Sequence, residues 1–155
     1  MIPSLLQDFL VKELKNLFVG FKLKNAKDEY SNLNIYPQYL PAKKGQKDID
    51  HFPFITVKVI EGEDPNETDA NTCRIMLMVG VYDMDEDYQG YKDVLNILQK
   101  MYTHLMSNRV FDCRYEVEYP IKFTLTDEDY QPYFFGALDT KWVIGKMTIK
   151  NDELI

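Results

Sequence analysis

The acidic segment DMDEDYQGYKDV has the spacing that comes nearest to a metal-binding motif in this chain. Asp83, Asp85 and Asp87 stand at the first, third and fifth positions of a calcium loop, where carboxylate oxygens would coordinate the ion. The sixth position is Tyr88, where the sharp turn of such a loop needs glycine. The twelfth is Val94, where the loop needs a bidentate glutamate. The segment therefore predicts an acidic turn that leads into a helix, and no metal site.

Other side chains that perform catalysis lack the partners that their chemistry needs. His51 and His104 have no cysteine or acid at ligand spacing, so no zinc site is predicted. Cys73 and Cys113 lack CxxC spacing and indicate reduced, structural thiols in a cytoplasmic protein. No serine has an elbow-type glycine setting, and no glycine-rich phosphate loop is present. We expect no enzyme activity and no cofactor.

The composition is that of a folded, acidic protein. The 155 residues are 45% hydrophobic and 14% aromatic, which predicts a single domain over residues 1–155 with its own core. The net charge is −7, whereas nucleic-acid binding needs clustered Lys and Arg, so no specific nucleic-acid binding is expected. No apolar run approaches the ~20 residues of a membrane span, so no membrane partner is expected. The first residues lack the basic region of a signal peptide and predict a helix.

Hydrophobic periodicity predicts two amphipathic helices and four strands. The helices, at residues 3–19 and 88–107, have apolar side chains recurring at spacings of three and four. The strands are expected at residues 54–60, 73–82, 114–125 and 137–149. The order α-β-β-α-β-β predicts an α+β fold, with a mainly antiparallel four-stranded sheet and both helices packed on it.

Two connecting segments are unusual. Residues 22–53 form a long arm that we expect to be irregular, with a short edge strand at residues 34–40 because Pro37 is tolerated only at an edge or bulge. Residues 61–72 form an acidic hairpin loop that we expect to be exposed to solvent.

The strand at residues 73–82 is apolar on both faces. One face carries Cys73, Ile75, Leu77, Val79 and Val81, and the other carries Met76, Met78 and Tyr82. Such a strand is either central or covered on its second face by another chain.

The two later strands differ from this one. The strand at residues 114–125 alternates as a half-wet antiparallel strand does, and Pro120 predicts an edge or a bulge. Just before the last strand, Tyr130, Tyr133, Phe134 and Phe135 form an aromatic turn between Pro132 and Gly136. These aromatics are either core or a docking patch, with core favoured.

The arm, the acidic loop, the second strand face and the aromatic turn supply the candidate interface residues. They are Tyr36, Tyr39, Glu61, Glu63, Asp64, Glu67, Asp69, Met76, Met78, Tyr133 and Phe134.

Three blocks of the sequence resemble one protein family. They are IYPQYLPAKK…FPFITVKVIEGED, MLMVGVYDMDEDYQGYKDVLNILQKMYTHL and PIKFTLTDEDYQPYFFGALDTKWVI. Over residues 33–145 the chain resembles tail terminator, or tail-completion, proteins of long-tailed bacteriophages and of prophages in Gram-positive bacteria.

The resemblance implies a virion structural protein without catalytic residues. Such a subunit forms a homo-oligomeric ring, typically a hexamer, that caps the tail tube. Its partners would be further copies of itself, the major tail tube protein and the head–tail connector proteins. It would act in the host cytoplasm during assembly and stay at the head–tail junction of the virion. Two alternatives remain open: another head–tail junction or head-completion protein, and a small ligand-binding or hydrolytic domain that uses the acidic turn.

Overall fold

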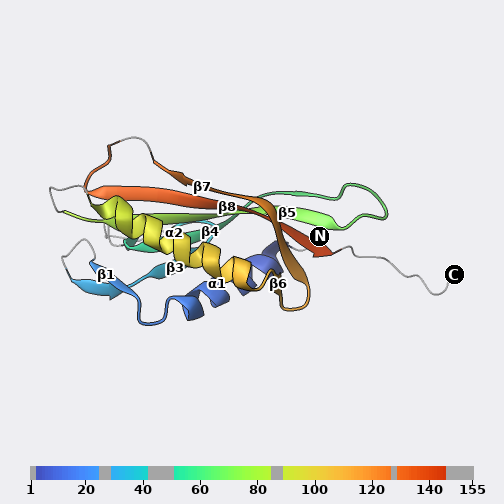
Figure 1. Ribbon diagram of the computed structural model, residues 1–155, viewed down its shortest axis with the longest axis horizontal. Helices are drawn as coiled ribbons and strands as arrows, with labels where there is room; N and C mark the ends of the chain where they lie inside the picture. Colours follow the sequence, from blue (N-terminus) through green and yellow to red (C-terminus); the bar gives the residue numbers. More distant parts are fainter. Residues whose placement is uncertain (1–2, 25–28, 42–50, 85–88, 127–128, 146–155) are drawn as a thin grey trace.

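The chain is an α+β protein whose two helices lie on one face of a curled sheet (Figure 1). The computed structural model describes residues 3–24, 29–41, 51–84, 89–126 and 129–145. Its elements, in chain order, are α1 (Pro3–Leu17), β1 (Lys22–Lys24), β2 (Tyr30–Asn32), β3 (Asn34–Pro37), β4 (Phe54–Glu63), β5 (Asn71–Tyr82), α2 (Gly90–Ser107), β6 (Val110–Phe111), β7 (Tyr115–Leu125) and β8 (Tyr133–Gly145).

The main sheet has six strands in the order β3-β4-β5-β8-β7-β6, and β1 and β2 form a separate hairpin. Strand β3 is parallel to β4, and every other pair in this sheet is antiparallel. The prediction of a four-stranded sheet is therefore wrong, although its four strands and two helices are present in the predicted order. The added edge strands have four and two residues, which is too short to produce a periodic hydrophobic signal.

The arm is more ordered than the sequence predicted. Its first part forms the β1–β2 hairpin, and its edge strand is confirmed as β3, which ends at Pro37. After β3, Gln38 has a positive φ. Its side-chain amide makes the two backbone hydrogen bonds to Val59 that a neighbouring strand would otherwise make. The Gln38 amide donates to the Val59 carbonyl at 3.0 Å and accepts from its N–H at 2.9 Å. Residues 42–50 of the arm lie outside the described residues.

Helix α1 begins at Pro3, as a first-turn proline allows. Its buried side chains, Leu6, Leu10 and Leu14, recur every four residues and pack towards β3 and β4. Gly20 has a φ of +78°, the left-handed conformation in which glycine ends a helix without a steric penalty.

Helix α2 packs on β5 and β8 with most of the apolar stripe that its periodicity predicts, since Val94, Leu98, Met101 and Leu105 are buried. Ile97 is fully buried, whereas Tyr91 and Tyr102 of the expected stripe are 40% and 38% exposed. The apolar stripe of α2 is wider than the sheet surface available to it, so one side of the stripe stays open. The ring of Phe134 lies where a side chain on Gly90 would stand, so only glycine fits at that first helical position. Asp85 and Asp87, predicted before this helix, lie outside the described residues.

The core lies between the helices and the sheet. The β5 face that carries Cys73, Ile75, Leu77, Val79 and Val81 is at most 1% exposed. Strand β5 lies between β4 and β8, so it is a central strand, which is the first of the two alternatives that its sequence left open.

Strands β7 and β8 confirm one prediction from the sequence and overturn another. In β7 the register shifts between Glu118 and Lys122, so the bulge predicted from Pro120 is confirmed. Strand β8 already begins at Tyr133, and the predicted aromatic turn is wrong because Tyr133 pairs with Tyr82 in the sheet. Residues 146–149 of the predicted last strand lie outside the described residues. Among the helices described here, none has the length and apolar character needed to cross a membrane.

Candidate functional site

Several of the predicted interface residues lie on the outer face of the sheet, which is the face opposite the two helices. Tyr36, Met76, Met78 and Tyr133 alternate with buried core residues and so point away from the helices. The structure thereby brings together side chains from three strands. Phe134 does not belong to this set, because it faces α2 and packs against the core.

One half of the outer face is aromatic. The ring of Phe52 lies 4.9 Å from Phe54, 5.1 Å from Tyr133 and 5.8 Å from Phe135, measured between centroids. Tyr82 lies 5.7 Å from Tyr133 across the β5–β8 pair. These contacts contribute to the burial of the cluster, which neither α1 nor α2 covers.

Beside the aromatic cluster, Tyr36 lies edge-on to His51, with ring centroids 5.5 Å apart. Burial raises the pKa of the Tyr36 hydroxyl. The buried His51 Nδ1 and Thr56 Oγ1 have no hydrogen-bond partner among the described residues.

The other half of the outer face is charged. The Arg74 guanidinium donates two hydrogen bonds to the Asp139 carboxylate, at 2.8 and 2.7 Å. This hydrogen bonding, the charge of Asp139 and the charge of Glu61 raise the pKa of Arg74. Lys141 stands opposite Arg74, and Lys122 stands opposite Asp139, so charges of both signs lie side by side. Together with Glu61 and its neighbours they line a cavity of about 580 Å³.

Sequence reasoning identified Glu61 and Glu63 of this charged half but missed the Arg74–Asp139 pair. Arg74 and Asp139 are 65 positions apart and meet only because β5 pairs with β8. Only a prediction of the register between β5 and β8 could have shown from the sequence that these two side chains meet.

The acidic hairpin is shorter than predicted. Glu61 and Glu63 belong to β4, and β5 already begins at Asn71, so the loop covers only residues 64–70. The predicted exposure of the acids Glu61, Glu63, Asp64, Glu67 and Asp69 is confirmed.

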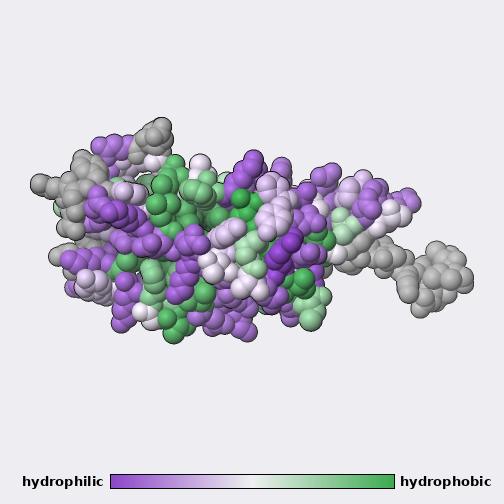
Figure 2. Space-filling model, viewed as in Figure 1, coloured by the Kyte–Doolittle hydropathy of each residue, from purple (hydrophilic) through white to green (hydrophobic). Residues whose placement is uncertain are grey.

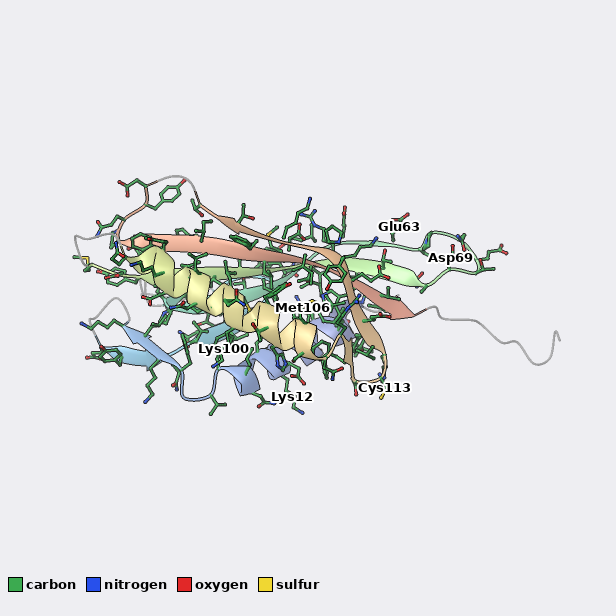
Figure 3. All side chains as sticks on the ribbon, viewed as in Figure 1. Lys12, Glu63, Asp69, Lys100, Met106 and Cys113 are labelled. Atoms are coloured by element: carbon green, nitrogen blue, oxygen red, sulfur yellow. The ribbon has the colours of Figure 1, made fainter. Side chains whose placement is uncertain are left out.

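The loop has its own internal order. The Asn66 side-chain oxygen accepts hydrogen bonds from the backbone N–H groups of Thr68 and Asp69, at 2.9 and 2.7 Å. Figure 3 shows Glu63 and Asp69 on the projecting hairpin, away from α1 and α2. The last predicted interface residue, Tyr39, is 72% exposed and lies under the Lys58 ammonium, 5.6 Å from the ring centroid.

A second surface, which sequence reasoning did not identify, lies on the helix side of the sheet. It is an apolar groove of about 560 Å³ between α2 and β7. Its lining residues are Leu95, Asn96, Leu98, Gln99, Tyr102, Ile121, Phe123 and Leu138. Phe123 of β7 faces the helix side, opposite the buried Leu138, yet it is 64% exposed, so α2 leaves this side chain uncovered. Figure 2 shows hydrophobic surface in this region.

The described side chains form an aromatic cluster, a charged cavity and an apolar groove, all of which are suited to contact with another molecule. No group of three or more His, Cys, Asp or Glu residues that could hold a metal occurs within the described ranges. Of the three aspartates in the predicted acidic turn, only Asp83 is described. The prediction that this segment holds no metal ion therefore stays a prediction from the sequence.

Comparison with protein-family models finds no match to this chain. A search of curated proteins likewise finds none with significant similarity. The functional assignment therefore depends on the sequence blocks and on the surfaces described above.

Proposed function

We propose that the protein is a tail terminator of a long-tailed bacteriophage or prophage, which acts by assembling into a ring and not by chemistry. The ring, a hexamer in the family that the sequence resembles, would cap the finished tail tube and offer its other side to the head connector. Three sequence blocks support this proposal, since they share the acidic turn before α2 and the aromatic start of β8 with that family.

The observation that supports the proposal best is the outer face of the sheet. Both helices lie on the opposite face, and the outer face combines half-buried apolar side chains such as Met76 and Met78 with the Arg74–Asp139 pair. Apolar area bordered by charged groups is typical of a surface that binds protein. The α2–β7 groove lies on the other side of the sheet, so each copy has two different surfaces. A cyclic ring with head-to-tail contacts requires two such surfaces on every subunit.

The acidic hairpin has a specific place in this proposal. Five carboxylates on one projecting hairpin would repel DNA, so a ring with these hairpins at its channel would let DNA pass without binding it. At physiological salt such repulsion acts over only about 8 Å, so the hairpins must line the channel closely.

Binding to tail tubes tests the proposal. Tubes assembled from the major tail protein of the same genome are incubated with the protein, sedimented and imaged by electron microscopy. We expect the protein to co-sediment and to form a ring at one tube end. The variant Met78→Lys, which places a charge on the outer face, should lose this binding. The matched variant Lys12→Glu changes an exposed side chain on α1 and should retain it (Figure 3). If the protein neither binds tubes nor self-associates, the terminator proposal is wrong.

The acid hairpin is tested separately. A variant with Gln or Asn at all five acidic positions should melt at nearly the same temperature, because the five side chains are exposed. It should nevertheless impair head–tail joining or DNA ejection. Unfolding of this variant would show that the acids are structural, and unchanged infectivity would show that the loop is only a solvated turn.

The neighbouring role, a head-completion or connector protein, predicts a different result. In that case the protein binds DNA-filled heads and not isolated tubes. The same sedimentation experiment with purified heads separates the two roles.

A further inference from the structure

The α2–β7 groove lies beside a strand edge that has no neighbour among the described residues. One edge of β7 pairs with β8, and the other edge pairs with β6 only at Tyr115 and Glu116. Along this second edge, the backbone from Lys122 to Leu125 has no strand partner among the described residues. An open edge presents backbone N–H and C=O groups that can bind a further strand. Alternate side chains of such a strand would enter the neighbouring groove.

The sequence after β8 has the pattern of such a strand. Ten residues, KMTIKNDELI, follow Gly145. Met147 and Ile149 stand at alternate positions, as in a strand with one apolar face. Asp152 and Glu153 follow and are opposite in charge to the exposed Lys92, which lies one helical turn before the groove residue Asn96.

We propose that residues 146–155 of a second copy of this chain bind in the α2–β7 groove, with Met147 and Ile149 against Phe123 and the open side of α2. This proposal rests on the self-association proposed above and names the contact that produces it.

Chain length decides that the segment comes from a second copy. Leu138 lies in the groove, and Gly145 is seven residues further along β8, about 23 Å away at the rise of a strand. Ile149 lies four residues beyond Gly145 and reaches at most about 14 Å from it. Phe123 stands opposite Leu138, so the apolar pair cannot reach Phe123 of its own copy. A subunit that gives its segment to one neighbour and receives one from another makes the head-to-tail contact that a closed ring repeats.

Disulfide cross-linking between two full-length variants tests the contact. Both variants carry Cys113→Ser, because Cys113 is exposed and Cys73 is buried. One variant carries Asn96→Cys at the groove and the other carries Ile149→Cys. After the two are mixed and oxidised with copper phenanthroline, we expect a 96–149 cross-linked dimer. The control replaces Asn96→Cys by Lys12→Cys on the exposed side of α1, and it should cross-link at least tenfold more slowly (Figure 3). Equal rates for the two pairs would overturn the proposal.

A peptide gives a second, independent measurement. A fluorescent peptide with the sequence of residues 146–155 is titrated with full-length protein that carries Met147→Ser and Ile149→Ser, so that its own segment does not compete. We expect saturable binding, and at least tenfold weaker binding when the peptide carries the same two serines. Equal binding of the two peptides, or no binding of either, would overturn the proposal. Neither measurement uses tail tubes. A failure here with intact tube binding would leave the proposed function standing, and the reverse result would refute only that function.

Discussion

The two faces of the central strand β5 have opposite properties, although their residues alternate in one stretch of sequence. On the inner face, Leu77 is fully buried beneath the helices, and its neighbours two positions away are equally inaccessible. On the outer face, Met76 and Met78 are half-buried and lie between an aromatic cluster and a charged cluster. An apolar side chain therefore does not by itself indicate core. The inner face stabilises the fold, and we propose that the outer face stabilises the assembly.

The sharpest test of this contrast compares two adjacent residues. Leu77→Ala should lower the free energy of unfolding by about 2–5 kcal/mol, because it leaves a cavity under the helices. Met78→Ala removes a half-buried side chain and should cost about 1 kcal/mol. Urea denaturation measures both effects, and co-sedimentation with tail tubes measures binding. Only the Met78 variant should combine near-normal stability with weakened binding; equal losses of stability would show that the outer face is also core.

The next largest effect concerns a buried polar chain on the inner face. The Trp142 indole N–H donates to Thr140 Oγ1 at 2.9 Å, and that hydroxyl donates to the Ile75 carbonyl at 2.7 Å. Thr140→Val has nearly the same shape but leaves the buried indole N–H unpaired, which costs about 1–3 kcal/mol. Trp142 is the only tryptophan, so its fluorescence follows unfolding directly. Thr140→Ser keeps the hydroxyl and serves as the control. If Val and Ser are equally stable, the hydrogen-bond chain does not stabilise the fold.

The contrast between the faces also explains how far the sequence could be read. Both long helices and four long strands were predictable because their side chains repeat with the period of helix or strand over ten or more residues. The edge strands β3 and β6 are too short for that signal, and only β3 was predicted, from the proline at position 37. Their place depends on backbone hydrogen bonds to β4 and β7, which are independent of side-chain pattern.

The candidate site was only partly predictable for a related reason. Alternation placed Met76 and Met78 on the outer face, as expected. It could not place Asp139 beside Arg74, because that contact depends on the register between two strands far apart in sequence. The helical periodicity of α2 also overestimated how much of this helix is covered. The width of an apolar stripe gives no information about the width of the sheet surface on which the helix packs. Tyr102 and the groove beside it were missed in this way.

The β6–β7 turn lies away from both faces of the sheet. We expect its contribution to stability to depend on its backbone conformation and not on side-chain packing. Asp112 and Cys113 have φ values of 53° and 54°, and the Arg114 N–H donates to the Phe111 carbonyl at 3.1 Å. Two successive left-handed residues are typical of a type I′ hairpin turn, which favours glycine at its second position. Cys113→Gly should therefore raise the free energy of unfolding by about 1 kcal/mol. Cys113→Ala also removes the thiol but keeps the Cβ, and a similar gain in that variant would refute the backbone explanation.

The smallest expected effect lies at the boundary of the covered face, where Asp93 stands in the first turn of α2. Partial burial raises the pKa of its carboxyl, and the nearby charge of Asp83 raises it further. Because the folded state then holds the proton more tightly than the unfolded state, the protein is most stable when this group is protonated. Stability falls as the pH rises from the ordinary aspartate pKa through the raised folded value.

Asp93→Asn removes that ionisation and should raise the melting temperature at pH 7 by about two degrees, while the two proteins should melt together near pH 3. Asp93 also lies at the helix N-terminus, where a negative charge is favourable by about 0.3–1 kcal/mol at an exposed site. The raised pKa means that burial and Asp83 outweigh this benefit, so the sign of the change is the informative result. A lower melting temperature for Asp93→Asn at pH 7 would show that the helix dipole dominates, and that this edge of α2 is wetter than the covered face beside it. Asp69→Asn, on the exposed hairpin, controls for the loss of a carboxylate far from this helix end.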